Sequence, residues 1–414
     1  MSGQSHSQSA LAGCRVIEIS SSAGAIAGRI LADLGADVIK IEPEGGEPAR
    51  FAEPTLTLGD GSRLSSYWLA FNINKRSICL DLSTNEGGAK FSALVRSADI
   101  VITDFQRMSA GESERLAALA CAANPGIVFA EIWPFGRGGA YETYPATDTI
   151  LQALGGHLFL NGDIDRAPVR IGLPVGLMQG GAEAASAALM AYYHRLRTGK
   201  GQRVDISIQE CIIWTLLNTT MAWQILELNE MRGGAVRKER ANRFYTRLVW
   251  PCADGHIFFG PVGGGGGVAR EKSYAGLVAW MAEEGIKDAL LTGREWNGPG
   301  QFHVPQEDYD AVSELIGRFI AAKTSAELME QAVKRRILLA PVSTVEQILR
   351  YDHLRERGFY LPLSDDRRGF KVDYPAVWAS LSDTPLCVLT SAPFAGEHTR
   401  QVEEELSQRA SHHG

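Results

Sequence analysis

The sequence lacks the signals of several classes of protein. Its six cysteines, at positions 14, 79, 121, 211, 252 and 387, form no CxxC pair, and no histidine stands at metal-ligand spacing from them, so we predict neither a disulfide framework nor a metal site. Lysine and arginine form no block and the formal net charge is −7, which argues against nucleic-acid and membrane partners. No apolar run approaches the roughly 20 residues that span a bilayer, and the polar start MSGQSHSQSA is unlike a signal peptide. We therefore expect a cytoplasmic protein with reduced thiols.

What is present is the composition of an ordinary globular protein, 45% hydrophobic and 21% charged over 414 residues, which is enough for two domains. Residues 15–20 (RVIEIS) predict a strand, AGRILADLGAD has helical spacing, and residues 37–41 (DVIKI) predict a second strand. A βαβ unit of this kind opens a parallel, doubly wound sheet. Gly24 and Gly28 lie at its first turn without GxGxxG spacing, so we attribute them to close packing rather than to a dinucleotide site.

The alternation of strands and helices continues along the chain. We predict strands at 77–82, 100–103, 127–132 and 203–208, and helices at 86–97, 180–198 and about 209–228. Residues 248–260 (LVWPCADGHIFFG) predict a β-hairpin that turns at Asp254 and Gly255. The pattern predicts an α/β protein with a large domain at 1–229 and 331–414, a linker at 230–244 and a small domain at 245–330.

Eight stretches spread over nearly the whole chain carry a resemblance to a known family. They read GCRVIEIS, LADLGADVIKIEPEGG, FNINKRSICLDLS, ADIVITDF, NPGIVFAEIWPFG, RLRTGKGQRVDISIQE, APVSTVEQILRYDHLRERGF and GEHTRQVEEEL. In this order they resemble the family III CoA-transferases, the formyl-CoA, carnitine and benzylsuccinate group. The resemblance implies a Rossmann-like large domain built from both chain ends, an inserted smaller α/β domain, and two subunits threaded through each other as an interlocked-ring dimer.

The resemblance also implies a catalytic residue that this chain lacks. In active members, an Asp before the Ala-rich helix attacks the acyl-CoA and then carries CoA as an aspartyl thioester, which requires an ionised carboxylate. In the stretch APVRIGLPVGLMQGG, the flanking Pro and Gly residues place Leu177 at that position. A hydrocarbon side chain cannot act as this nucleophile. Glu183 follows nearly two helical turns later and is not expected to replace it.

Three positions at which family members carry basic residues for the CoA phosphates differ as well. Ser83 stands where a Lys commonly follows LDL, Glu112 where an Arg follows the NFxPG turn, and Pro145 where a basic residue precedes the substrate helix. A carboxylate close to a phosphate repels it by roughly a kcal/mol or more when partly buried. Together with Leu177, these differences predict that the subunit's own CoA site is not used.

A few residues remain as candidates for contacts with CoA. They are Lys75 and Arg76 in NINKRS and Phe105 in DFQRMSAG; for the two basic residues, an exposed turn before a strand is an equal alternative. Asp148 is either the acid of a racemase-like site or the N-cap of the helix that begins TILQAL.

Five consecutive glycines form the most unusual run in the sequence. They are Gly263, Gly264, Gly265, Gly266 and Gly267. Such a run favours neither helix nor strand and predicts a flexible loop. Active family members carry a glycine-rich loop that closes over the acyl site, and in an interlocked dimer this loop can serve the partner's site. A plain linker is the alternative.

We therefore expect the non-catalytic subunit of a heteromeric family III CoA-transferase, with a homologous Asp-bearing subunit as partner. The resemblance to the succinyl-CoA:benzylsuccinate type implies that CoA moves from succinyl-CoA to an aromatic succinate such as benzylsuccinate. CoA thioesters would be substrates bound by the partner, and no tightly bound cofactor is expected. The alternatives are a self-sufficient acyl-CoA transferase, racemase or lyase that uses another acid such as Asp148, and a CoA-independent scaffold protein.

Overall fold

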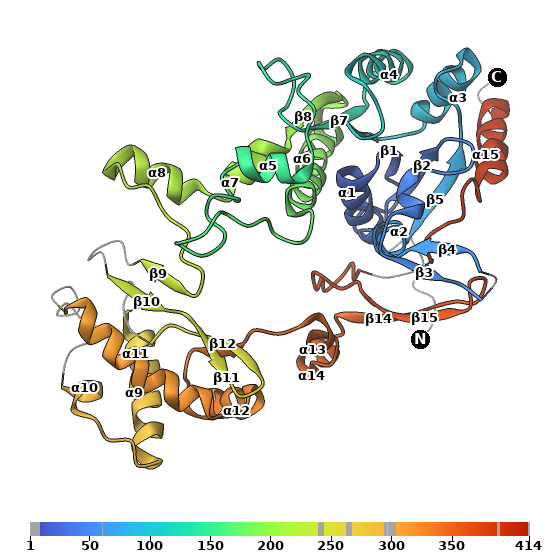
Figure 1. Ribbon diagram of the computed structural model, residues 1–414. Helices are drawn as coiled ribbons and strands as arrows, with labels where there is room; N and C mark the ends of the chain where they lie inside the picture. Colours follow the sequence, from blue (N-terminus) through green and yellow to red (C-terminus); the bar gives the residue numbers. More distant parts are fainter. Residues whose placement is uncertain are drawn as a thin grey trace. The chain divides into compact units, whose positions relative to one another are not determined.

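The structure is a computed structural model that describes residues 9–59, 61–238, 244–261, 267–293, 296, 304–386 and 390–412 (Figure 1). The chain divides into two compact units. The first comprises Met1–Gly156, Ile171–Leu217 and Asp352–Gly414, and the second comprises His157–Arg170 and Asn218–Tyr351. No described helix has both the length and the apolar character needed to span a membrane.

The first unit is built on a parallel sheet of six strands in the order β5-β2-β1-β6-β7-β8. The strands are β1 (Arg15–Ile19), β2 (Asp37–Glu42), β5 (Lys75–Cys79), β6 (Ile100–Asp104), β7 (Val128–Trp133) and β8 (Gln202–Ser207). The chain runs outwards from β1 to β5, returns to the other side of β1, and runs outwards again to β8. This reversal creates a topological switch point between β1 and β6, where sheets of this kind bind their ligands. The prediction of an α/β protein with a parallel sheet is confirmed.

The strands of this sheet carry apolar side chains on both faces, because each face is covered by helices. Val16, Ile102 and Ala130 belong to a core shared with α1 and α6, whereas their neighbours Ile17 and Val101 belong to a core shared with α3 and α4. The helices and 3₁₀ turn of this unit are α1 (Ser22–Asp33), η2 (Pro48–Phe51), α2 (Ser66–Phe71), α3 (Asn85–Arg96), α4 (Ala110–Ala123), α5 (Asp148–Leu154), α6 (Val175–Thr198), α7 (Ile208–Trp214), α14 (Asp352–Glu356) and α15 (Thr399–His412). Two short hairpins complete it, β3 (Thr55–Thr57) with β4 (Arg63–Ser65) and β14 (Tyr360–Asp365) with β15 (Phe370–Pro375).

Glycines allow α1 to approach its neighbours closely. A Cβ atom on Gly24 would lie 2.2 Å from Ser20 Cβ, and one on Gly28 would lie 1.9 Å from Glu18 Oε2. On α6, a Cβ atom on Gly181 would lie 2.4 Å from the carbonyl oxygen of Ala23 in α1. The prediction that Gly24 and Gly28 serve close packing is confirmed.

The second unit has its own sheet and its own core. The antiparallel strands β11 (Val249–Cys252), β12 (Gly255–Phe259) and β13 (Leu339–Pro341) form the sheet. The predicted hairpin is confirmed, but its turn is formed by Ala253 and Asp254, one residue before the predicted position. Its other elements are α8 (Leu217–Leu226), β9 (Val236–Lys238), β10 (Tyr245–Arg247), α9 (Gly267–Glu283), α10 (Ala289–Thr292), α11 (Gln306–Ala321), α12 (Ser325–Arg335) and α13 (Val345–Leu349). The core is aromatic, with the rings of Phe244 and Tyr309 stacked at 3.9 Å.

Several boundaries differ from those predicted. The apolar helix expected at 209–228 is two helices, α7 and α8, and at the end of α7 the hydroxyl of Thr215 donates to the carbonyl of Ile212. The Ala-rich helix α6 begins at Val175 rather than at 180, so position 177 lies inside it. Residues 331–341 were assigned to the large domain, but Leu339 in β13 pairs with β12 and packs in the core of the second unit.

The close approach at Gly28 predicts a large effect of one methyl group. Gly28→Ala should displace the Glu18 carboxylate from its ion pair with Lys75 and destabilise the fold by about 2–4 kcal/mol in urea unfolding. Gly111→Ala in α4 is the matched control, since a Cβ atom there meets nothing within 4 Å and should be neutral or slightly stabilising. Equal stability of the two variants would contradict the packing argument.

Candidate functional site

The switch point is formed by the segments that follow β1 and β6. Ser20 and Ser21 lead from β1 into α1, and Asp104 ends β6. In dinucleotide-binding folds, a phosphate sits here on the free backbone N–H groups at the start of the helix. Both segments belong to the first unit, so their geometry is defined within one compact body.

In this chain, side chains from the β6 end occupy the N-terminus of α1. Asp104 Oδ2 accepts hydrogen bonds from the backbone N–H of Ser21 at 2.8 Å and of Gly24 at 3.2 Å. Gln106 Oε1 accepts one from the N–H of Ser22 at 3.0 Å. The N–H groups that would hold a ligand phosphate are therefore already bonded, which gives a physical reason against a dinucleotide site at this position.

Asp104 is a buried acid of this crevice. It is only 1% exposed, and burial raises its pKa to about 6, although the N–H groups of Ser21 and Gly24 oppose this shift. The carboxyl group changes charge in a pH range that a solvated aspartate does not reach. Its negative charge also lies where an incoming phosphate would be repelled.

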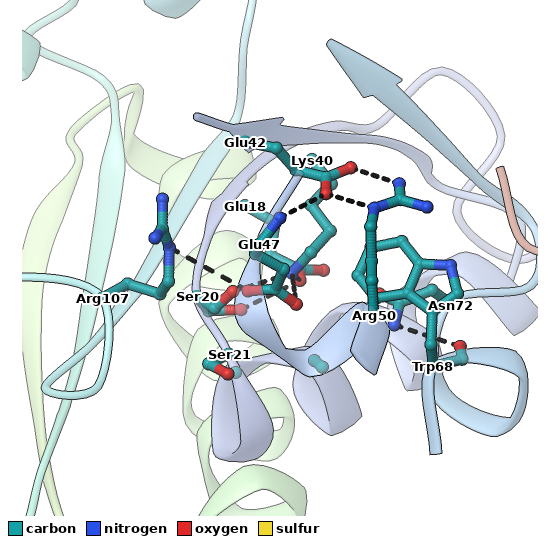
Figure 2. Close-up of polar contacts among 12 residues, drawn as sticks. Glu18, Ser20, Ser21, Lys40, Glu42, Glu47, Arg50, Trp68, Asn72 and Arg107 are labelled. Carbon is teal, nitrogen blue, oxygen red and sulfur yellow. Dashed lines mark hydrogen bonds and ion pairs between the residues drawn. The ribbon is translucent and has the colours of Figure 1, made fainter. Parts of the chain in front are cut away.

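Next to the crevice lies a cluster of buried charges from β1, β2 and β5, and Figure 2 shows its members Glu18, Lys40 and Glu42. Glu18 of β1 is 2.7 Å from Lys40 Nζ and 2.8 Å from Lys75 Nζ, with all three side chains fully buried. Lys40 also donates to the carbonyl oxygen of Ser20 at 2.7 Å, which connects the cluster to the crevice. Burial lowers the pKa of Lys75 to about 8, because the charge of Glu18 offsets only part of the cost of removing the ammonium from water.

The cluster continues through Glu47 towards the end of β6. Glu47 lies 3.3 Å from Lys40 and 3.9 Å from Arg107, and within the described residues neither of its carboxylate oxygens accepts a hydrogen bond. Burial raises the pKa of Glu47, since these two cations compensate it incompletely. Beside it, Arg50 pairs with Glu42 at 2.6 Å and stacks 3.8 Å above the ring of Trp68. Arg107 therefore faces a carboxylate of its own chain.

Leu177 is the third residue of α6 and is 6% exposed. Its side chain belongs to the apolar core that includes Leu151 and Ile212. Its backbone N–H donates a hydrogen bond to Asp148 Oδ1 at 3.0 Å. The position at which we predict the nucleophile of active relatives is thus occupied by a core side chain, with a carboxylate already bonded to its backbone.

Asp148 is not the N-cap of α5, as one of the two sequence interpretations had it. Thr147 is the N-cap, and its hydroxyl accepts from the N–H of Ile150, while Asp148 is the first residue of the helix. The Asp148 carboxylate instead bonds the start of α6 and the side-chain amide of Gln152. It stabilises the positive end of a different helix from the one predicted.

The structure does not bring together the three predicted CoA contacts. Lys75 is 2% exposed and paired inside the sheet, so the alternative of an exposed turn is wrong for it. Arg76 pairs with Asp37 and Glu405 at the amino end of β5, each at 2.6 Å. Phe105 follows the carboxyl end of β6 and packs against the core on the α1 side. The two basic residues and Phe105 therefore lie at opposite ends of the sheet.

The remaining sequence candidates have local structural roles. Glu112 forms a capping box with Ser109 at the start of α4, and the N–H of Ser109 holds the pKa of Glu112 below its usual range. Ser83 bonds its neighbour Asp81. Of the glycine run, Gly263–Gly266 fall outside the described residues, and Gly267 is the first residue of α9.

Sequence reasoning missed the buried charges and Asp104. A signal was present, because Glu18, Lys40 and Glu42 stand inside the strands VIEI and VIKIE of a parallel sheet, which are normally apolar throughout. A charge at such a position is rarely left without a partner. Nothing in the sequence, however, shows which carboxylate meets which ammonium group across the sheet.

Comparison with known proteins agrees with this architecture. The model of CoA-transferase family III matches residues 11–399. The chain belongs to this family. It is 28% identical over 396 residues to succinyl-CoA:(R)-benzylsuccinate CoA-transferase subunit BbsE of Thauera aromatica, across 94% of this chain and 92% of that protein. It is also 28% identical over 410 residues to the succinyl-CoA–L-malate CoA-transferase alpha subunit of Chloroflexus aurantiacus, across 98% and 90%.

Among solved structures, a CAIB/BAIF family protein from Brucella suis superposes with a TM-score of 0.78 at 26% identity, over 95% of this chain and 98% of that one. The family predicted from the eight sequence stretches is confirmed, and with it the assignment of the chain to the CoA-transferases. The roles of individual residues in this family member follow from the geometry above and are proposed below.

The contact of Asp148 with α6 predicts a modest effect on stability. Asp148→Ala removes the acceptor for the N–H of Leu177 and should lower the free energy of unfolding by about 1 kcal/mol. Asp148→Asn keeps an acceptor oxygen, so its free energy of unfolding should fall by less. Urea unfolding of the three proteins measures both differences, and equal losses in the two variants would show that the hydrogen bond is not what stabilises α6.

The raised pKa of Asp104 predicts a characteristic pH dependence. Between the ordinary value of 3.8 and about 6, the folded chain holds a proton on Asp104 that the unfolded chain has released, so this residue makes stability fall as pH rises. Relative to Asp104→Asn, the wild type should lose roughly 2 kcal/mol of unfolding free energy between pH 4 and pH 7. Parallel stability curves for the two proteins would contradict this.

Proposed function

We propose that this chain is the non-catalytic subunit of a heteromeric family III CoA-transferase. The observation that carries the proposal is Leu177, a buried hydrocarbon side chain at the position where we align the nucleophilic Asp. A thioester cannot be exchanged through an anhydride without a carboxylate at this point. The chain would then contribute its fold to the enzyme, while a homologous Asp-bearing subunit contributes the chemistry.

The electrostatics of the crevice support the proposal. CoA is polyanionic, so its site needs free N–H groups or cations. Here Asp104 and Gln106 occupy the N–H groups at the start of α1, and Arg107 faces Glu47. Arg203 of β8 forms an ion pair with Glu131 of β7 at 2.7 Å. The N–H groups at the start of α1 and the guanidinium of Arg203 are engaged within the chain, and Arg107 lies 3.9 Å from the carboxylate of Glu47. This arrangement favours CoA binding by the partner.

The geometry of Asp148 argues against the self-sufficient alternative. A general base must reach a substrate proton with a free oxygen. Asp148 uses Oδ1 for the backbone of Leu177 and contacts Gln152 with its other oxygen. Because both oxygens are engaged within the chain, a racemase or lyase that uses this acid is the weaker candidate.

The relatives support a partner and a substrate class. BbsE is named as a subunit of a succinyl-CoA:(R)-benzylsuccinate transferase, and the Chloroflexus protein as an alpha subunit of a succinyl-CoA–L-malate transferase. We propose succinyl-CoA as CoA donor and an aromatic succinate such as benzylsuccinate as acceptor. The two subunits would form interlocked rings, and the run Gly263–Gly267 would serve the active site of the partner.

The purified chain should be inert by itself. Incubated with succinyl-CoA and analysed by intact-protein mass spectrometry, it should form no covalent acyl or CoA adduct, because it has no carboxylate at position 177. It should also transfer no CoA to benzylsuccinate. Addition of an Asp-bearing family III subunit from the same organism should produce both the activity and an adduct on that subunit alone.

The matched control is the Asp-bearing subunit with its nucleophile changed to Asn. This complex should assemble but remain inactive, which separates loss of chemistry from loss of assembly. Transfer of CoA at a normal enzymatic rate by this chain in the absence of any partner would overturn the proposal.

A further inference from the structure

Strand β5 lies at an open edge of the six-stranded sheet, because it comes first in the strand order. An edge strand presents backbone N–H and C=O groups that can add a strand from another molecule, and proteins normally cover or interrupt such edges. Figure 1 shows α15 beside β5, so the C-terminal end of the chain lies at this edge. We refer to residues 390–412 as the C-terminal cover.

One residue of the C-terminal cover bonds both backbone groups of Ser77 in β5. The backbone N–H of His398 donates to the carbonyl oxygen of Ser77 at 2.8 Å, and the N–H of Ser77 donates to His398 Nδ1 at 3.2 Å. Two residues further along the strand, the N–H of Cys79 donates to the hydroxyl of Thr399 at 3.1 Å. Three backbone groups of the edge are therefore bonded without a further strand.

A glycine brings the C-terminal cover close to the strand. Gly396 has a φ of +65°, and a Cβ atom there would lie 2.9 Å from the sulfur of Cys79. Its N–H donates to the hydroxyl oxygen of Ser77 at 2.9 Å. Glycine adopts this backbone conformation without strain and leaves room for the approach. The turn at Gly396 thus places His398 against the edge.

The rest of the C-terminal cover is held by charges and by apolar packing. Glu405 lies 2.6 Å from Arg76 and 3.1 Å from Arg15, and Val402 is buried in the core on the α3 and α4 side of the sheet. Among these attachments, the imidazole of His398 is the group whose ordinary pKa is closest to neutral pH.

The contact with Ser77 requires a neutral imidazole that carries its proton on Nε2. In the protonated ring both nitrogens are donors, so Nδ1–H would face the N–H of Ser77 and the hydrogen bond would be lost. His398 also directly precedes α15, which begins at Thr399. The positive end of the helix dipole disfavours a further positive charge at this position.

The surroundings of His398 also favour the neutral ring. Burial has the largest effect and lowers the pKa of His398 below its ordinary value of 6.5. The acids Glu397 and Asp37 oppose this shift, whereas the guanidinium groups of Arg76 in β5 and Arg367 between β14 and β15 reinforce it. Arg76 pairs with Asp37, and Arg367 pairs with Glu397, so each of these acids already has a cation beside it.

We propose that His398 is a pH-sensitive attachment of the C-terminal cover, and that uptake of one proton by its imidazole releases the cover and exposes the edge of β5. As the pH falls below 6.5, the released form binds the proton more readily than the attached form, so the attachment weakens. The exposed edge can then pair with a strand of another molecule. This switch acts within one chain and does not depend on the proposed function.

Hydrogen exchange of the full chain, followed by mass spectrometry, measures the attachment directly. Expressed as protection factors, which remove the intrinsic pH dependence of exchange, the protection of β5 and α15 should fall by about tenfold between pH 7 and pH 5, as expected for the loss of one hydrogen bond. Strand β1 lies inside the sheet and should keep its protection. This readout requires no variant.

Two substitutions of His398 separate its charge from its role as an acceptor. His398→Asn offers an oxygen to the N–H of Ser77 and does not titrate, so β5 should stay equally protected at pH 7 and pH 5. His398→Ala has no acceptor, so the reduced protection should be present already at pH 7. His353→Asn replaces an exposed histidine in α14 and is the matched control, which should behave as the wild type.

Three results would overturn the proposal. The first is constant protection of β5 in the wild type between pH 7 and pH 5, and the second is an equal loss in β1, which would indicate unfolding of the whole unit. The third is a wild-type pH dependence that persists in His398→Asn. Asp104, with its pKa of about 6, titrates in the same range and is present in every variant, so such a result would assign the effect to another group.

Discussion

The first unit depends on the ion pairs of Glu18 with Lys40 and Lys75, which join three adjacent strands inside the sheet. Each of these charges would be costly to bury alone, and removing one partner would leave the others uncompensated. The pairing accounts for Gly28, because no Cβ atom fits beside the Glu18 carboxylate. It also fixes the carbonyl of Ser20 through Lys40, and so fixes the loop from which α1 begins.

The position of this loop also determines the hydrogen bonds in the crevice. Once the start of α1 is fixed, its N–H groups need acceptors, and Asp104 and Gln106 provide them from the neighbouring strand end. The carboxylate of Asp104 therefore does for the helix what a bound anion does in dinucleotide-binding folds. One strand order can therefore carry two kinds of site. In one, the helix N–H groups bind a phosphate; in the other, side chains of the same chain accept their hydrogen bonds, and only a few residues beyond the strands decide between the two.

The sequence predicted the sheet well because apolar strands and glycine-bounded turns are local signals. VIEI, VIKIE and the turn at Asp254 were recognisable without knowing their neighbours. The site was predictable only in part. For Lys75, an exposed turn was an equal alternative to a CoA contact because basic residues are usually exposed. Its partner Glu18 lies 57 positions away in the sequence. Asp148 was matched to the nearest helix, whereas its acceptor role concerns α6, which begins 27 positions later. Both errors concern contacts that only the tertiary fold creates.

Position 177 lies in surroundings that differ from those an ionised nucleophile needs. Its side chain packs in the core on the α1 side of the sheet, and Asp148 already bonds its backbone. An aspartate introduced there would be removed from water in the apolar surroundings of Leu177 and would lie close to the carboxylate of Asp148. Desolvation and a neighbouring negative charge both raise the pKa of an acid. A nucleophile must be ionised, so the change of side chain alone would not supply one. The surroundings of Leu177 are those of a core position.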